Sequence, residues 1–244
     1  MTLPTIVFVP GAWHTCDYYK QVISILAEKG FPAKTVDLPS VGGISSMTDD
    51  AIAIQKVTSK LANDGQQIIL VMHSYGGIPG TESAKGLSRE IRQAKGEPGG
   101  IIALVYVSAY LIKEGMSVLS VAGDAEWPPF LIKQDGIILY DESTAIERFY
   151  HDFPKDESPT AWAMKLKPQS AASFSGALSY AAHRDIPAIY LLCEQDRSLP
   201  IGLQELFVSY AEGKITTRVC KTGHSPMVTM PDEVVDAILM AVEA

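Results

Sequence analysis

Three short segments carry a serine, a carboxylate and a histidine, in that order along the chain. Ser74 follows the apolar run 68–72 after His73, Asp196 follows an apolar run that ends in Cys193, and His224 lies in a loop near the C-terminus. A histidine that accepts the serine proton, and an acid that orients the histidine, together activate serine as a nucleophile. The pattern therefore predicts a catalytic triad of Ser74, Asp196 and His224.

The local pattern around Ser74 is the strongest of the three. A short apolar strand, a sharp turn at a serine and a segment with helical character over 78–94 form a nucleophile elbow. Gly76 and Gly77 have no bulky side chains, so the strand and the helix can approach closely around a strained turn. A serine that merely caps a helix is the alternative, and the strand–turn–helix context favours the catalytic interpretation.

The acid is assigned by its position relative to the strands. Asp196 follows the strand predicted at 186–193, whereas Asp185 precedes it and would lie at the opposite edge of a sheet. Glu194 is a rival that lies closer to the strand, and Glu114, after an earlier strand, is a more distant one. Asp196 is preferred because a turn residue at its position can point toward the histidine.

Of the five histidines, His224 alone occupies the loop after the last predicted strand. His73 is expected to pack beside the nucleophile, and His14 either to touch substrate or to lie at the surface. A tetrahedral intermediate needs two preorganised N–H donors. We expect them on the backbone of Tyr75, after the nucleophile, and of Ala12, which follows Gly11 in the loop after the first strand.

The elements that must position these groups alternate along the chain. Strands are predicted at 5–9, 31–37, 68–72, 101–107, 186–193 and 215–220, and helices at 18–29, 47–61, 78–94, 201–211 and from 226 or 231 to 242. This rhythm predicts an α/β fold with a mostly parallel six-stranded sheet and helices on both faces. Residues 112–185 are too long for a plain loop, so we expect a helical cap there, inserted into a core formed by residues 1–111 and 186–244.

Composition limits the class of partner. The net charge of −8 and the lack of clustered Lys and Arg exclude a nucleic-acid partner. No apolar run approaches the roughly 20 residues of a membrane span, and the N-terminus has no basic region or cleavage site of a secretory signal. Three widely spaced cysteines indicate a reducing compartment without disulfides or a zinc site. A cytoplasmic protein that needs no metal and no cofactor is expected.

Four motifs together carry a family resemblance. They are Val9-Pro10-Gly11-Ala12-Trp13-His14, Met72-His73-Ser74-Tyr75-Gly76-Gly77, Cys193-Glu194-Gln195-Asp196-Arg197-Ser198-Leu199-Pro200 and Gly223-His224-Ser225-Pro226-Met227. The chain resembles the α/β-hydrolases, and more narrowly the branch of plant methyl esterases and hydroxynitrile lyases. The resemblance implies the α/β-hydrolase fold, and homodimers are common in similar proteins.

The chain departs from the family pattern at two positions. Pro10 stands where the family usually has a histidine before the glycine. Met72 replaces the first small residue of the elbow, so a neighbouring side chain must be small to make room. Neither change removes a catalytic group.

The resemblance also bears on the reaction. The lyases of this branch carry a lysine directly after the catalytic histidine, where this chain has Ser225, and dehalogenases and epoxide hydrolases use an aspartate as nucleophile. We therefore predict a serine hydrolase that cleaves a small, apolar or aromatic carboxylic ester, thioester or lactone through an acyl-enzyme on Ser74. A cofactor-free lyase or C–C bond-cleaving or cyclising enzyme of a natural-product pathway is the alternative, and a non-catalytic receptor for a small ligand is a minor one.

Aromatic and apolar side chains near the catalytic positions and in the cap are candidates for the substrate pocket. The alternative for each cap aromatic is the cap's own core. The predicted pocket residues are Trp13, Trp127, Phe130, Phe149, Trp162 and Met227.

Overall fold

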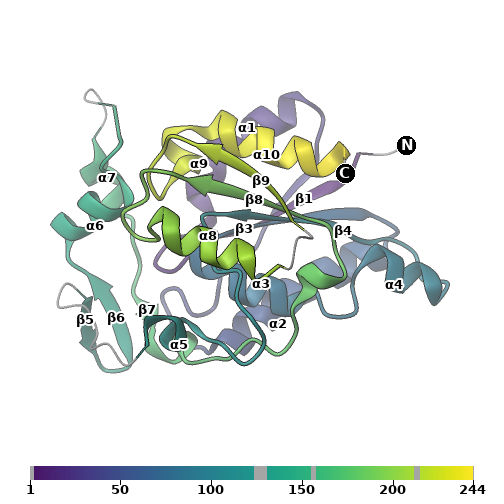
Figure 1. The fold of residues 1–244 in the computed structure, drawn as a ribbon, viewed down its shortest axis with the longest axis horizontal. Helices are drawn as coiled ribbons and strands as arrows, with labels where there is room; N and C mark the ends of the chain where they lie inside the picture. The colour runs from purple at the N-terminus through teal and green to yellow at the C-terminus, as the bar shows by residue number, and fades with distance from the viewer. Residues whose placement is uncertain (1–2, 124–130, 155–157, 212–214, 244) are drawn as a thin grey trace.

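A six-stranded parallel sheet forms the centre of the computed structural model, which describes residues 3–123, 131–154, 158–211 and 215–243 (Figure 1). Its strand order is β2-β1-β3-β4-β8-β9, and every neighbouring pair is parallel. The strands are β1 (Thr5–Val9), β2 (Ala33–Thr35), β3 (Gln67–His73), β4 (Gly100–Val107), β8 (Ala188–Cys193) and β9 (Ile215–Cys220). The predicted α/β-hydrolase sheet is thus confirmed.

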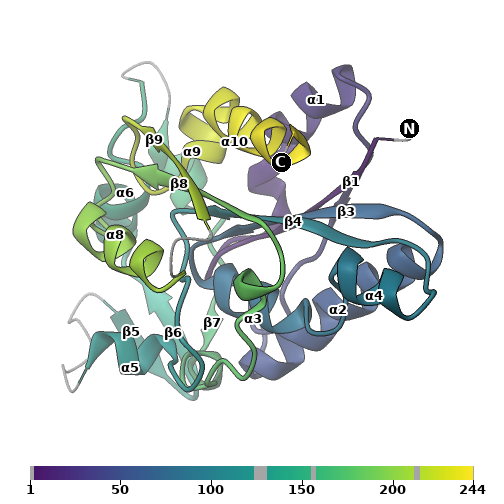
Figure 2. The same ribbon diagram turned by 45° about the vertical axis from the view of Figure 1, so that its right-hand side comes forward.

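The inner strands are largely apolar because helices cover both faces of the sheet. Figure 2 shows α1 (Lys20–Glu28) and α10 (Pro231–Glu243) on one face, with α2 (Met47–Asn63), α3 (Gly77–Ser83), α4 (Arg89–Ala94) and α8 (Ile201–Ser209) on the other. The side chains of β1 and β8 are all buried, whereas the edge strand β9 exposes several of its residues. No described helix is both long and apolar enough to cross a membrane.

Two predicted helices are each divided in the structure. The segment 78–94 forms α3 and α4, separated by a turn in which Gly86 takes a φ of 75°, a left-handed conformation that glycine adopts without strain. The C-terminal segment forms α9 (Pro226–Thr229) and then α10. Pro231 has no N–H to continue the first helix, so a new helix begins there.

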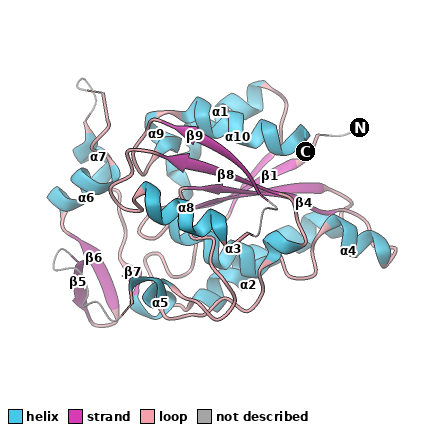
Figure 3. Cartoon of the chain, viewed as in Figure 1, coloured by secondary structure: helices cyan, strands magenta, loops and turns pink. Residues whose placement is uncertain are grey.

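Residues 112–185, called the insertion below, contain helices as expected, and also strands that the sequence analysis did not predict (Figure 3). The insertion holds α5 (Val118–Ala122), β5 (Leu131–Gln134), β6 (Ile137–Tyr140), α6 (Glu142–Phe149), α7 (Pro159–Ala163) and β7 (Gln169–Ser170). The three strands form a separate antiparallel sheet in the order β5-β6-β7. Asp135 and Gly136 join β5 to β6 with positive φ values of 49° and 81°, as a two-residue hairpin turn requires.

The carboxyl ends of all parallel strands meet at one edge of a sheet, and the chain places its polar residues there. Ser74 follows β3, Asp196 follows β8 and His224 follows β9. Residues 148–152 of the insertion lie against these loops, as the contacts below show. The sheet and the insertion together therefore form the candidate site.

Candidate active site

Ser74 lies on a strained turn directly after β3, as the first residue of the short 3-10 helix η2 (Ser74–Gly76). Its φ is 50°, which is uncommon for a residue with a side chain and marks a position held by its surroundings. A Cβ on Gly76 would overlap the carbonyl oxygen of Pro10, and one on Gly77 would lie 2.5 Å from the carbonyl oxygen of Tyr110. Only glycine fits at these two positions, so the nucleophile elbow has its expected geometry.

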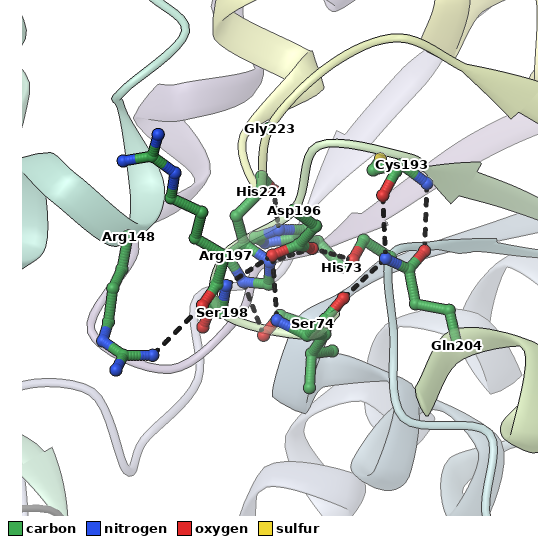
Figure 4. A network of polar contacts seen from close by, with 12 residues as sticks. His73, Ser74, Arg148, Cys193, Asp196, Arg197, Ser198, Gln204, Gly223 and His224 are labelled. Atoms are coloured by element: carbon green, nitrogen blue, oxygen red, sulfur yellow. Dashed lines mark hydrogen bonds and ion pairs between the residues drawn. The ribbon is translucent and has the colours of Figure 1, made fainter. Parts of the chain in front are cut away.

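His224 lies between Ser74 and Asp196 and contacts both (Figure 4). Its Nε2 is 3.0 Å from Ser74 Oγ, and its Nδ1 is 2.7 Å from Asp196 Oδ2. An ionised carboxylate can only accept, so the proton resides on Nδ1 and Nε2 accepts from the serine hydroxyl. His224 and Asp196 are 1% and 5% exposed, whereas Ser74 is partly open to solvent. This is the arrangement that makes a serine nucleophilic.

The loop after β8 holds the Asp196 carboxylate in place. Asp196 Oδ1 accepts the N–H groups of Ser198 at 2.7 Å and Leu199 at 2.8 Å. Gln204 of α8, which is fully buried, bonds both backbone groups of Cys193 and the carbonyl oxygen of Leu199. Gln204 thereby fixes both ends of the loop (Figure 4).

Ser108 is a further neighbour of the acid that the sequence analysis missed. It directly follows β4, is fully buried, and its hydroxyl donates to Asp196 Oδ2, the oxygen that also contacts His224. Its φ of 38° is left-handed, so this serine is held in an unfavourable backbone conformation that aims the hydroxyl at the acid. No spacing signal marks it, because a serine after a strand is common.

The rival acids lie elsewhere. Glu194 is exposed. Glu114 forms an ion pair with Arg184, and Asp185 accepts a hydrogen bond from the Tyr180 hydroxyl.

Two other histidines pack behind the site as neutral side chains. His73 Nε2 lies 2.8 Å from the carbonyl oxygen of His224, and burial holds the His73 pKa well below its ordinary value. His14 is 2% exposed, so the surface alternative for it is wrong. Its Nδ1 donates to the Ala12 carbonyl oxygen at 2.7 Å, and burial lowers its pKa to about 3.

The loop after β1 touches the nucleophile through its main chain. A Cβ on Gly11 would lie 2.8 Å from Ser74 Cβ and 2.9 Å from His73 Nδ1, so a larger residue would push the loop away. Ala12, next in the chain, is 3% exposed. Tyr75 is the second residue of η2, and N–H groups in a first helical turn have no acceptor within the helix.

Residues 148–152 of the insertion contact the loops that carry the acid and the base. Arg148 Nη1 donates to the Arg197 carbonyl oxygen at 3.1 Å (Figure 4). The ring of Phe149 lies 5.3 Å from the ring of His224, centroid to centroid. Arg148 thus reaches the loop of Asp196, and Phe149 packs on His224 itself.

The same segment also contacts the remaining loops. The Tyr150 hydroxyl lies 2.9 Å from His14 Nε2. Asp152 Oδ2 accepts the N–H of Gly223 at 2.6 Å and the hydroxyl groups of Thr222 at 2.8 Å and Thr229 at 3.1 Å. The insertion is therefore bonded to the residue that precedes His224, which the sequence pattern did not reveal.

The predicted pocket residues take different places. Phe149 packs on His224, and Trp13 packs on Phe149 with ring centroids 6.1 Å apart. Met227 is buried in α9. Trp162 packs instead against Tyr18, with a centroid separation of 5.2 Å. Two members of the predicted set lie outside the described residues: Trp127 and Phe130.

The cysteines show no sign of reactivity. Cys16, Cys193 and Cys220 are free and buried, and burial raises the pKa of the Cys193 thiol well above its usual range. A buried thiol with a raised pKa is a poor nucleophile. Within the described ranges, no group of three or more His, Cys, Asp or Glu side chains is arranged to hold a metal ion.

The strand order and the elbow define an α/β-hydrolase fold, and sequence comparison gives the family. The chain belongs to the alpha/beta hydrolase family, whose profile matches residues 6–237, and it is a hydrolase. It is 32% identical to alpha/beta hydrolase nvfD of Aspergillus novofumigatus, over 98% of this chain and 96% of that protein.

Two further comparisons bear on the narrower resemblance. Methylesterase 18 of Arabidopsis thaliana is 25% identical, over 96% of this chain and 95% of that protein, which confirms the resemblance to plant methyl esterases. The crystal structure of a pyrethroid hydrolase from Sphingobium faniae superposes with a TM-score of 0.79 at 21% identity, covering 100% of this chain and 98% of that one. That superposition confirms the fold.

Proposed function

We propose that the protein is a serine esterase that cleaves a small, apolar or aromatic carboxylic ester, thioester or lactone through an acyl-enzyme on Ser74. The observation that carries the proposal is the hydrogen-bonded series from Ser74 Oγ through His224 to Asp196, with separations of 3.0 and 2.7 Å. A partly exposed hydroxyl at one end and a buried carboxylate at the other are what nucleophilic catalysis by serine needs.

In the proposed reaction, His224 accepts the Ser74 proton as Oγ forms a bond to the substrate carbonyl carbon. The carbonyl oxygen becomes an oxyanion, which accepts hydrogen bonds from the N–H groups of Ala12 and Tyr75. The bond to the leaving alcohol, thiol or ring oxygen then breaks, and that group takes the proton from His224. Water adds to the acyl-enzyme with His224 as base, which releases the carboxylic acid and restores Ser74.

Asp196 serves this cycle without being protonated. It keeps the His224 proton on Nδ1 and stabilises the imidazolium that forms when Nε2 takes the serine proton. The donors from Ser198, Leu199 and Ser108 hold the carboxylate in the orientation that this role requires.

The preference for an apolar or aromatic acyl group is supported by a cluster of rings beside the series. Trp13 lies 4.7 Å from Tyr140, and Tyr140 lies 4.7 Å from Phe149, between ring centroids. Phe174 packs on Tyr75 at 5.5 Å. We include in the proposal that the insertion, which supplies Tyr140, Phe149 and Phe174, is the cap that selects the substrate. The homodimer and cytoplasmic location expected from the sequence belong to the same proposal.

The test compares the protein with its Ser74→Ala variant on p-nitrophenyl esters of short aliphatic and aromatic acids, with a thioester, a lactone and a β-diketone alongside. We expect a burst of p-nitrophenol from the wild type, fluorophosphonate labelling at Ser74, and loss of both in the variant. Asp196→Asn should lower kcat by about 10⁴-fold while the fold is kept. Turnover of the β-diketone without ester cleavage would replace this proposal by a C–C bond-cleaving enzyme.

A further inference from the structure

A chain of buried hydrogen bonds joins the two segments that carry the proposed oxyanion donors. The N–H of Trp13 donates to Gln169 Oε1 at 3.1 Å, and Gln169 Nε2 donates to Ser40 Oγ at 2.9 Å. Ser40 donates to Asp50 through its N–H at 2.8 Å and its hydroxyl at 2.6 Å. The Tyr75 hydroxyl donates to Asp50 Oδ2 at 2.7 Å. We call these five residues the Asp50 network.

The centre of the Asp50 network is shielded from water. Ser40, Asp50 and Gln169 are each 0% exposed, and Tyr75 is 1% exposed. Burial raises the pKa of the Asp50 carboxyl, and the hydrogen bonds from Ser40 and Tyr75 oppose that rise. A buried carboxylate is costly unless its oxygens are bonded, so its donors must keep their places. Asp50 also lies in the first turn of α2, where the helix dipole favours a negative charge.

One end of the Asp50 network fixes the loop after β1. Trp13 has a φ of 63°, a conformation that a bulky residue takes only when its surroundings hold it. The peptide unit that joins Ala12 to Trp13 is bonded on both sides, because its C=O accepts from His14 Nδ1 and its N–H donates to Gln169. The peptide unit directly after the Ala12 N–H is therefore held by one neighbouring side chain, His14, and by one distant side chain, Gln169.

The other end fixes the residue after the nucleophile. The hydroxyl of Tyr75 is anchored on Asp50, 25 positions away in sequence. Since the same residue offers its backbone N–H to the oxyanion in the proposed mechanism, the anchored hydroxyl restricts the backbone that carries this donor. The sequence pattern predicts a role only for the Tyr75 N–H, whereas the structure also gives its hydroxyl a partner, Asp50.

We infer that the Asp50 network aligns the two N–H donors of the oxyanion hole, with Asp50, Gln169 and the Tyr75 hydroxyl as positioning residues. The inference rests on the proposed function. It differs from a purely structural role because it concerns the transition state: loss of alignment lowers the rate of acylation and leaves substrate binding almost unchanged.

The first test is Tyr75→Phe, which removes the hydroxyl and keeps both the ring and the backbone N–H. We expect the acylation rate and kcat to fall by about tenfold, a part of the 10²–10³ that a lost oxyanion donor costs, while KM changes by less than about twofold. Binding of a trifluoromethyl ketone, which forms the tetrahedral oxyanion with Ser74, should weaken by the same factor as kcat/KM falls.

Tyr106→Phe is the matched control. Tyr106 is fully buried and its hydroxyl contacts Thr81 Oγ1 at 2.6 Å, so the control removes an equivalent buried hydroxyl outside the Asp50 network. We expect its kcat and its affinity for the ketone to equal those of the wild type. An equal loss in both variants would show that any buried tyrosine hydroxyl has this effect, and would overturn the inference.

A second test uses the far end of the chain of bonds. Gln169→Met keeps the side-chain length and removes both polar atoms. The double variant with Tyr75→Phe completes a double-mutant cycle. If one network aligns both donors, the double variant should lose little more than the larger single loss. Fully additive losses in log kcat would overturn the inference. Asp50→Asn should match Tyr75→Phe, and if it fails to fold, the cycle still decides the question.

The two proposals fail in different ways. Retention of activity by Ser74→Ala would overturn the proposed function. Loss of activity in Ser74→Ala together with wild-type kcat and ketone affinity in Tyr75→Phe would overturn only the role of the Asp50 network, as would a rise in KM at constant kcat.

Discussion

The side chain of Met72 occupies the space that a Cβ on Gly80 would need. Such a Cβ would overlap the Met72 sulfur and lie 2.7 Å from its Cγ. Met72 is fully buried in β3, one residue before the strand ends, and Gly80 lies in α3, the helix that follows the nucleophile. The small neighbour that a methionine in the elbow was expected to require is therefore Gly80.

Gly80→Ala should destabilise the protein by about 1–3 kcal/mol, because the added methyl group overpacks a full interior. The free energy of unfolding in urea measures this. Gly202→Ala in α8 is the control, since nothing lies within 4 Å of its added Cβ, and we expect it to be neutral or slightly stabilising. Met72→Ala introduced into Gly80→Ala should recover part of the loss; no recovery would contradict the contact.

Ser108→Ala should lower kcat by roughly tenfold with little change in KM, because the acid loses a hydrogen bond to its charged form. Ser108→Gly removes the same hydroxyl and also relieves the backbone at a φ of 38°. The two variants should have the same kcat, and Ser108→Gly should be more stable than Ser108→Ala by about 1 kcal/mol. A wild-type kcat in both would show that the hydroxyl does not position Asp196.

Asp152→Ala should lower kcat by about tenfold, because the Gly223 N–H loses its charged acceptor and the loop that carries His224 gains freedom. Steady-state kinetics at saturating ester measures the loss. Asp141→Ala is the control from the same insertion. The Asp141 side chain caps α6 through the Thr144 N–H at 3.1 Å, so its loss should cost about 1 kcal/mol of stability and no activity. Equal kcat values in the two variants would contradict the role of Asp152.

The buried histidines predict loss of stability in acid. The His14 pKa is lowered from 6.5 to about 3, so below 6.5 the unfolded chain binds a proton that the folded chain does not. The contribution of neutral His14 to the free energy of unfolding is fully present above pH 6.5. It falls by about 1.4 kcal/mol per pH unit as the pH drops toward 3. In His14→Gln the slope of unfolding free energy against pH should be smaller by that amount. Parallel curves for the two proteins would contradict a neutral His14.

Much of the core could be predicted because local signals bound its elements. The ranges of β1 and β9 agree with the sequence prediction, since Pro10 ends the first strand and breakers flank the last. The hairpin of β5 and β6 was missed although Asp135-Gly136 is a strong turn signal. Its strands are only four residues long, and the length of residues 112–185 with their short helical patterns indicated helices alone.

The supporting residues of the site could not be predicted for a different reason. Gln169 and Ser40 are 129 positions apart, and Ser108 and Asp196 are 88 apart. Asp50 in a first helical turn has an ordinary explanation as a charge that suits the helix dipole. Spacing reveals residues that share a strand or helix, whereas these contacts exist only after the strands and the insertion have been assembled.

The contacts of residues 148–152 have a consequence for how this enzyme could diversify. The segment forms hydrogen bonds with the loops that carry Asp196 and His224. It also forms one with His14, in the loop after β1. A recombination event that exchanged the whole insertion with that of a relative would therefore exchange part of the catalytic scaffold as well. If the insertion selects the substrate, as we propose, substrate range and turnover are inherited together in such an architecture, and new specificities then arise more readily from single changes in the ring cluster than from transplanted insertions.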